Sequence, residues 1–85
     1  MKRTKFEICD QANPDKIIYK GQLGDLAWYS IGVDAYKAVV TDSNSKETQA
    51  EVSLVSASEP GQGDLFYLSV NGEEKDYTNQ VRWVE

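Results

Sequence analysis

The chain has 85 residues, a net charge of −5 and no histidine, which is enough sequence for one domain. Apolar residues make up 40% of it, so we expect a packed core rather than a disordered chain. These values exclude a multidomain enzyme, a membrane-spanning protein, a histidine-based catalyst and a disulfide-stapled miniprotein. We expect residues 1–85 to form a single domain.

The first predicted element is a hairpin. Residues 4–10 alternate between polar and apolar side chains, with Phe6 and Ile8 on one face, and therefore predict a strand. The Asn13-Pro14-Asp15 segment is typical of a turn, because proline presets φ and the flanking side chains bond back to the backbone. A second strand is predicted over residues 17–22.

The stretch from residue 25 to 42 admits two interpretations. Its spacing predicts a helix from about 25 to 41, with Asp25 as the N-cap. Gly32 opposes this helix, and the alternative is a strand from Leu26 to Val33 followed by a short helix that begins at Asp34. Both interpretations place one helix between strands. The side chains on the helical face recur in steps of three and four: Leu26, Tyr29, Val33, Tyr36 and Val40.

Three strands are predicted in the second half of the chain. A strand over residues 49–57 precedes a loop at 58–64, which is rich in Gly, Pro and polar residues. A strand over 65–70 leads into Asn71-Gly72, the strongest short signal for a hairpin turn. The return strand is predicted over about 76–84.

Together these elements predict an α+β fold. It would have two layers, a mostly antiparallel sheet of about five strands with one helix packed on it, in the order strand-strand-helix-strand-strand-strand. The predicted core contains one set of apolar side chains from all of these elements: Phe6, Ile8, Leu26, Val33, Val52, Leu54, Phe66, Leu68, Val81 and Trp83.

Few residues here support catalysis or ligand binding. The single cysteine, Cys9, has no histidine to activate it, so a thiol nucleophile is not expected. Residues 42–47 begin like a calcium loop, but Lys46 takes a ligand position and Glu47 replaces the required glycine. Residues 61–63 are glycine-rich but lack the Lys-Ser/Thr ending of a phosphate loop. We therefore predict no enzymatic activity, no cofactor and no metal.

The charge distribution predicts a basic protein partner. Residues 21–85 carry four basic and eleven acidic side chains, which disfavours direct binding of nucleic acid, although solubility alone also explains this acidity. Carboxylates around a solvated hairpin tip would steer a basic partner, and neighbouring tyrosines would supply contact area. The candidate partner-binding residues are Glu73, Glu74, Asp76, Tyr77, Tyr67, Asp42 and Glu47.

The length, the acidity, the lack of histidine and the predicted one-helix sheet resemble small acidic inhibitors carried by phages and mobile elements, including anti-CRISPR proteins. Some of these are similar down to an Arg-Trp-Val ending, here residues 82–84. The resemblance implies a small non-enzymatic inhibitor that blocks a host nucleic-acid-binding or nuclease complex. Its partner would be a basic host protein or ribonucleoprotein complex. Toxin-immunity proteins look similar by the same criteria.

Two further functions remain open. One is a structural or assembly subunit of a phage, whose edge strands pair with copies of itself. The other is a nucleic-acid-binding module that uses the basic N-terminal hairpin. We expect a monomer or small homodimer with no membrane contact, located in the bacterial host cytoplasm, because residues 4–10 alternate where a signal peptide needs an apolar run. The basic side chains of that hairpin are Lys2, Arg3, Lys5, Lys16 and Lys20.

Overall fold

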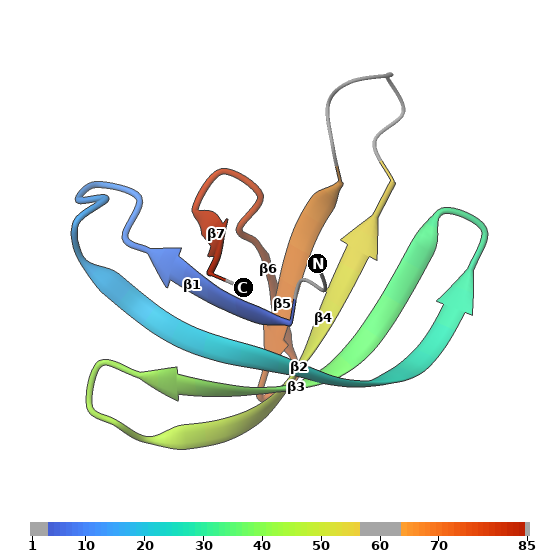
Figure 1. The fold of residues 1–85 in the computed structure, drawn as a ribbon, viewed down its shortest axis with the longest axis horizontal. Helices are drawn as coiled ribbons and strands as arrows, with labels where there is room; N and C mark the ends of the chain where they lie inside the picture. Colours follow the sequence, from blue (N-terminus) through green and yellow to red (C-terminus); the bar gives the residue numbers. More distant parts are fainter. Residues whose placement is uncertain (1–3, 57–63, 85) are drawn as a thin grey trace.

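The protein is an antiparallel β-sheet in the computed structural model, which describes residues 4–56 and 64–84. The seven strands of these residues lie in the order β6-β5-β4-β3-β2-β1-β7, so each strand from β1 to β6 pairs with the next and β7 returns to β1 (Figure 1). The strands are β1 (Lys5–Cys9), β2 (Ile17–Ser30), β3 (Val33–Asp42), β4 (Glu47–Val55), β5 (Leu65–Val70), β6 (Glu73–Asp76) and β7 (Val81–Trp83).

The predicted helix over 25–41 is wrong, and with it the α+β fold class, because none of the described residues is helical. These residues form the end of β2, a two-residue turn and most of β3. Gly32 lies in that turn with φ +81°, a conformation that suits glycine and has no place in a helix. The alternative interpretation found a strand near Leu26, but its short helix from Asp34 is also wrong, since Asp34 belongs to β3.

Several local predictions are confirmed. The first hairpin pairs β1 with β2, and its turn includes a hydrogen bond from the Lys16 N–H to the Asn13 carbonyl at 3.0 Å. Strand β5 covers the predicted residues 65–70. Asn71 and Gly72 both have positive φ, 54° and 80°, as a two-residue hairpin turn of type I′ requires. The return strand predicted over about 76–84 is wrong in its bounds, because the strand that returns along β5 is β6, Glu73–Asp76, and β7 pairs with β1 instead. Residue 57 of the predicted strand and residues 58–63 of the predicted loop lie outside the described residues.

The sheet curls so that strands distant in the sheet pack against each other. Phe6 on β1 and Phe66 on β5 lie with ring centroids 5.1 Å apart, although three strands separate β1 from β5 in the sheet. Trp83 on β7 packs edge-on against both rings, at 5.9 and 5.8 Å. Gly21 permits this packing, because a Cβ at that position would lie 2.2 Å from Phe6 Cζ.

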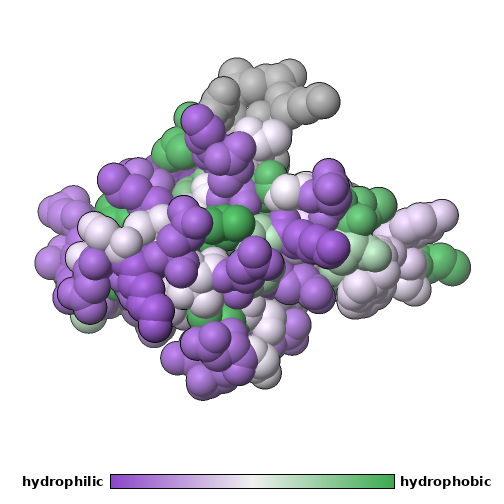
Figure 2. Space-filling model, turned by 90° about the horizontal axis from the view of Figure 1, so that it is seen from below, coloured by the Kyte–Doolittle hydropathy of each residue, from purple (hydrophilic) through white to green (hydrophobic). Residues whose placement is uncertain are grey.

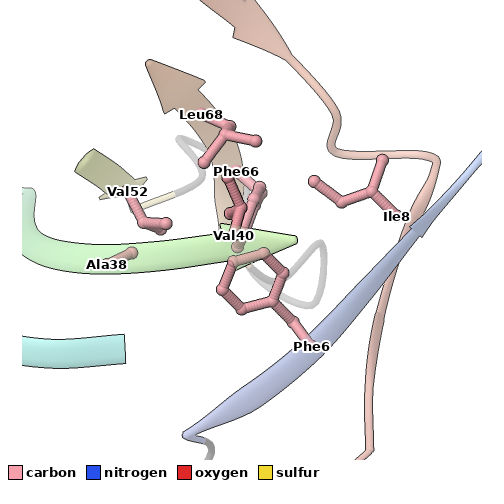
Figure 3. Packing of buried hydrophobic residues seen from close by; sticks show 7 residues of the cluster. All are labelled: Phe6, Ile8, Ala38, Val40, Val52, Phe66 and Leu68. Atoms are coloured by element: carbon pink, nitrogen blue, oxygen red, sulfur yellow. The ribbon is translucent and has the colours of Figure 1, made fainter. Parts of the chain in front are cut away.

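The core lies inside this curl (Figure 3). Leu26 is wrongly predicted to be in it, because its strand extends beyond the core and leaves it 48% exposed. Val33, Leu54, Val81 and Trp83 are half-buried rather than buried. The core predictions missed Ala35, Ala38 and Val40, which belong to the segment interpreted as helix. The buried core cluster is Phe6, Ile8, Ala38, Val40, Val52, Phe66 and Leu68.

A turn over residues 77–80 carries the chain from one edge of the sheet to the other. The Tyr77 N–H donates to the Phe66 carbonyl at 2.9 Å, and this bond holds the start of the turn against β5. The Cys9 N–H donates to the Gln80 carbonyl at 3.1 Å, and the Gln80 side-chain amide donates to the Cys9 carbonyl at 2.9 Å. These bonds fix the end of the turn against β1, where β7 begins. The described residues include no helix long and apolar enough to cross a membrane.

Candidate functional site

The main surface feature is the outer half of the β2–β3 hairpin, residues 24–34, which we call the distal hairpin. The pairing of β1 with β2 begins at Lys5 opposite Gln22, and a bond from the Leu23 N–H to the Thr4 carbonyl extends it by one residue. Beyond that point β2 pairs only with β3 in the described part of the chain. All residues from 24 to 32 are exposed, and the hairpin forms the right-hand end of the molecule in Figure 1.

The distal hairpin exposes large apolar side chains. The exposed fractions are 48% for Leu26, 50% for Trp28, 73% for Tyr29 and 102% for Ile31. Single exposed apolar residues are ordinary, but four within six positions of one strand and turn form a patch. Figure 2 shows pale and green atoms over the same right-hand end of the molecule, whereas the left-hand side is largely purple.

These side chains lie on both faces of the hairpin. Residues paired across two strands share a face, and Trp28 is paired with Ala35 whereas Leu26 is paired with Tyr36. Since Ala35 and Tyr36 are consecutive on β3, Trp28 and Leu26 point to opposite faces. In a regular strand these two residues would share a face, but the register of β2 is irregular between them and again between Leu23 and Leu26. Tyr29 is paired with Asp34 and so lies on the face of Leu26, and both faces of the hairpin therefore carry a large apolar side chain.

The turn of the distal hairpin is unusual in composition. Its two residues are Ile31 and Gly32, and only Gly32 has positive φ. Tight turns favour Gly, Asn, Asp, Ser and Pro, because these residues fit or stabilise the turn backbone. A fully exposed isoleucine contributes no packing here. Neither turn geometry nor packing therefore explains an isoleucine at position 31.

The charge around the distal hairpin is negative. Asp25 and Asp34 are both exposed, and residues 21–36 contain no lysine or arginine. Asp34 is paired with Tyr29, so one carboxylate stands directly beside an exposed ring. The surface combines apolar area with carboxylates.

Two of the predicted partner-binding carboxylates have structural roles. Asp76 Oδ1 accepts hydrogen bonds from the Thr78 N–H at 2.8 Å and the Thr78 hydroxyl at 2.5 Å, and these bonds lower the pKa of Asp76. The Thr78 hydroxyl oxygen in turn accepts the Phe66 N–H at 3.0 Å. Asp42 Oδ1 accepts the N–H groups of Asn44 and Lys46, both at 2.9 Å, and so closes the β3–β4 loop.

The structure brings some of the other predicted site residues together. Glu73 and Glu74 are exposed on β6, and half-buried Tyr67 on β5 is paired with Asp76. Tyr77 is half-buried and packs edge-on against Tyr19 with centroids 6.5 Å apart. Burial raises the pKa of Tyr77, with smaller contributions from Tyr19 and Glu73.

Glu47 is exposed at the start of β4, which lies two strands from β6 in the sheet. The described residues contain no group of three His, Cys, Asp or Glu side chains placed to hold a metal ion. Of the basic N-terminal residues, Lys2 and Arg3 lie outside the described residues, whereas Lys5, Lys16 and Lys20 are exposed.

The sequence analysis did not identify the distal hairpin as a site. The available signal is the run from Leu26 to Ile31, which is almost wholly apolar and ends at a glycine. An amphipathic helix would leave polar residues on one side of such a run, and this run has only Ser30. An apolar run that lacks a polar face and adjoins a turn residue is the signal that was missed.

No family model, no curated protein and no solved structure matches the chain. The resemblance to small phage inhibitors included a sheet with one helix, and the described residues contain no helix. That part of the resemblance fails.

Proposed function

We propose that the protein is a non-enzymatic binding protein that uses the distal hairpin to occupy a basic surface of another protein. One observation carries this proposal: Leu26, Trp28, Tyr29 and Ile31 are exposed together, on both faces and at the turn of a protruding hairpin. Tryptophan and tyrosine are the residue types most often responsible for binding energy at protein interfaces. The contact is therefore centred on the Trp28 and Tyr29 rings.

The partner is a protein with an apolar cleft and a cationic rim. A hairpin with apolar side chains on both faces is fully covered only by a concave site, because a flat surface covers one face. Asp25 and Asp34 are placed to meet basic groups at the rim of such a cleft. The net charge of −5, with Glu73 and Glu74 exposed on β6, adds long-range attraction.

Grooves that combine aromatic side chains with basic groups occur in proteins that bind single-stranded nucleic acid. The proposal therefore keeps the inhibitor function that the resemblance implied: the protein would block a host nucleic-acid-binding or nuclease complex in the bacterial cytoplasm. Nucleic acid itself is not the ligand, because the carboxylates would repel its phosphates.

Site-specific photo-crosslinking tests the proposal. Benzoylphenylalanine is placed at position 29 or, as a control, at position 39, where Val39 is exposed on β3 away from the distal hairpin. In bacterial cells that produce the protein, we expect position 29 alone to give one discrete crosslinked species. The crosslinked partner is then purified and its affinity measured against wild-type protein and Trp28→Ser at low and high salt.

The proposal requires three results together. The partner has a basic surface, Trp28→Ser weakens its binding by at least tenfold, and added salt weakens the binding of wild-type protein. Equal crosslinking from positions 29 and 39, or a crosslinked partner that binds Trp28→Ser as tightly as wild type, would show that the binding surface lies elsewhere.

A further inference from the structure

One row of cross-strand partners runs from the distal hairpin to β6 across the neighbouring strands of the sheet (Figure 1). Residues paired across strands share a face of the sheet. On β4 and β5 the row alternates with Val52 and Phe66, which are buried in the core, so it lies on the opposite, convex face of the curled sheet. The members of the row, in strand order, are Trp28, Ala35, Ser53, Tyr67 and Asp76.

Two aromatic rings stand in this row, with two small side chains between them. Ala35 is fully buried although it lies on the convex face, and of its two cross-strand partners, Trp28 and Ser53, only Trp28 is large. The Trp28 ring therefore covers the Ala35 methyl with one side and presents its other side to solvent, which agrees with its exposed fraction of 50%. Tyr67 is half-buried on β5, three strands and about 14 Å away along the sheet.

The charge beside these rings favours a basic ligand. Asp76 ends the row on β6, and the next row of the convex face contains Glu51 and Glu74. Lys37 is paired with Glu51, so three carboxylates accompany one lysine across the two rows. Lys75 points to the opposite face, since its partner on β5 is a core residue. Exposed carboxylates in this arrangement attract arginine and lysine side chains.

A proline-rich segment suits this surface better than a β-strand does. The backbone groups of β3, β4 and β5 are engaged with strands on both sides, so a strand laid across the convex face would leave its own N–H groups without partners. Proline has no N–H, and polyproline II forms without internal hydrogen bonds. Its carbonyls can accept the Trp28 indole N–H and the Tyr67 hydroxyl, while its rings pack on the aromatic faces. About five residues at ~3.1 Å each span the distance between the two rings.

We infer that the convex face is a second binding surface, and that its ligand is a proline-rich segment flanked by arginine or lysine. Trp28 and Tyr67 contact the prolines, and the three carboxylates contact the basic side chains. The inference goes beyond the proposed function, because it does not require the distal hairpin to enter a cleft. Of the distal hairpin, Trp28 takes part, whereas Leu26 and Tyr29 point to the opposite face.

Nuclear magnetic resonance titration of the isotopically labelled full chain tests the inference. The probe is a synthetic peptide of about five prolines with arginines at both ends. We expect it to shift the indole N–H resonance of Trp28, which Trp28→Ser identifies by its absence, and the amide resonances around Ser53 and Tyr67. Two control peptides, one with glycine and serine in place of the prolines and one with glutamates in place of the arginines, should each bind about tenfold more weakly.

Variants on the two faces locate the surface. Trp28→Ser and Tyr67→Thr should each weaken peptide binding by about tenfold. Leu26→Ser is the matched control, because Leu26 is exposed to a similar extent on the opposite face, and it should bind like wild type. Glu74→Lys changes an exposed residue of β6 and is expected to fold normally. It should weaken binding by roughly threefold at low salt and by less at high salt.

The inference is wrong if the peptide shifts no resonance at millimolar concentration, or if the glycine-serine peptide binds as tightly as the proline peptide. It is also wrong if Leu26→Ser weakens binding as much as Trp28→Ser, or if Glu74→Lys has no effect at low salt. Exposed rings on a sheet also stack on single-stranded nucleic acid, and a DNA oligonucleotide that shifted these resonances when the peptide did not would overturn the inference.

The proposed function is tested separately, because crosslinking from position 29 reports on the opposite face of the hairpin. A crosslinked partner without peptide binding would overturn this inference alone. Peptide binding without a crosslinked partner would overturn the proposed function alone.

Discussion

The β2–β3 and β5–β6 hairpins have turns of equal length and differ in the backbone of the first turn residue and in what they present to solvent. Each has a two-residue turn with glycine second, and φ is +81° at Gly32 and +80° at Gly72. The first turn residue is Asn71 in one hairpin, with φ +54°, and Ile31 in the other. Asparagine suits the positive φ at position 71, and isoleucine, at position 31 without positive φ, is not among the residue types that turns favour. The β5–β6 turn therefore follows folding requirements, and the β2–β3 turn departs from them.

The strands beside these turns differ in the same way. All four residues of β6 are charged and exposed, and β6 is an edge of the sheet, where charges discourage the addition of another chain. The outer part of β2 carries apolar side chains on both faces. A departure from local folding rules without a gain in packing marks a functional surface.

The largest expected difference between the two hairpins is in how much their aromatic residues contribute to the free energy of unfolding. Phe66 of β5 is 1% exposed and packs against Phe6 and Trp83, so Phe66→Ala should lower the free energy of unfolding by ~3–5 kcal/mol. Trp28→Ala removes a half-exposed ring and should cost below about 1 kcal/mol. Urea denaturation of both variants measures this, and similar losses would mean that the distal hairpin belongs to the core.

The two hairpins were not equally predictable from sequence, and the reason is local. Strand β5 and the turn at Asn71 are specified by alternation and by one dipeptide, so the sequence alone places them at the correct residues. In β2 the irregularities around Leu26 shift the phase of the side chains and destroy the alternation. What remains is a spacing of three and four that is indistinguishable from a helical face.

The candidate site was missed for a related reason. Exposure of Trp28 and Tyr29 depends on β1 pairing with β2 only as far as residue 23, which is a property of the whole sheet. Glu73, Glu74 and Asp76 were predicted around a hairpin tip and lie on the strand β6 that follows the turn. The turn roles of Asp42 and Asp76 depend on hydrogen bonds that a composition argument does not detect.

Exchanging the first turn residues tests the comparison directly. Asn71→Ile forces a β-branched residue into positive φ and should cost ~1–2 kcal/mol of stability. Ile31→Asn places a preferred turn residue before Gly32 and should leave stability unchanged within about 0.5 kcal/mol. Thermal melting of the two variants is the measurement. A large loss from Ile31→Asn would show that Ile31 has a folding role.

The carboxylates of the β5–β6 hairpin should also differ in how much each contributes to stability. Asp76→Ala removes both hydrogen bonds to Thr78 and should cost about 1 kcal/mol, whereas Glu74→Ala, its control, should cost less than about 0.5 kcal/mol. Because the pKa of Asp76 is lowered, its stabilising contribution is present above the ordinary value of 3.8 and is lost as pH falls through the folded pKa. Urea denaturation at pH 7 and at acid pH measures this. The difference in free energy of unfolding between the two variants should become smaller at acid pH.

The smallest expected effect is on stability at alkaline pH. Burial raises the pKa of Tyr77, so the folded protein holds this phenol proton at pH values where the unfolded chain releases it. Its contribution to stability is therefore complete below the ordinary pKa of about 10 and is lost as pH rises through the folded value. Tyr77→Phe should melt with less dependence on pH above 10 than wild type. Absorbance titration of the tyrosines should lose its latest step in this variant, and an unchanged titration would contradict the assignment.

The pairing of β1 with β7 also affects how the chain folds during synthesis. Phe6 is paired with Trp83, so the core is closed by residues from opposite ends of the described sequence. Contacts this distant in sequence make folding slow relative to a helical protein of equal length. While the ribosome is still translating β7, the rings of Phe6 and Phe66 lack the Trp83 that packs against both. The core is therefore completed only once β7 has been synthesised, and before that point the apolar side chains that it covers are exposed.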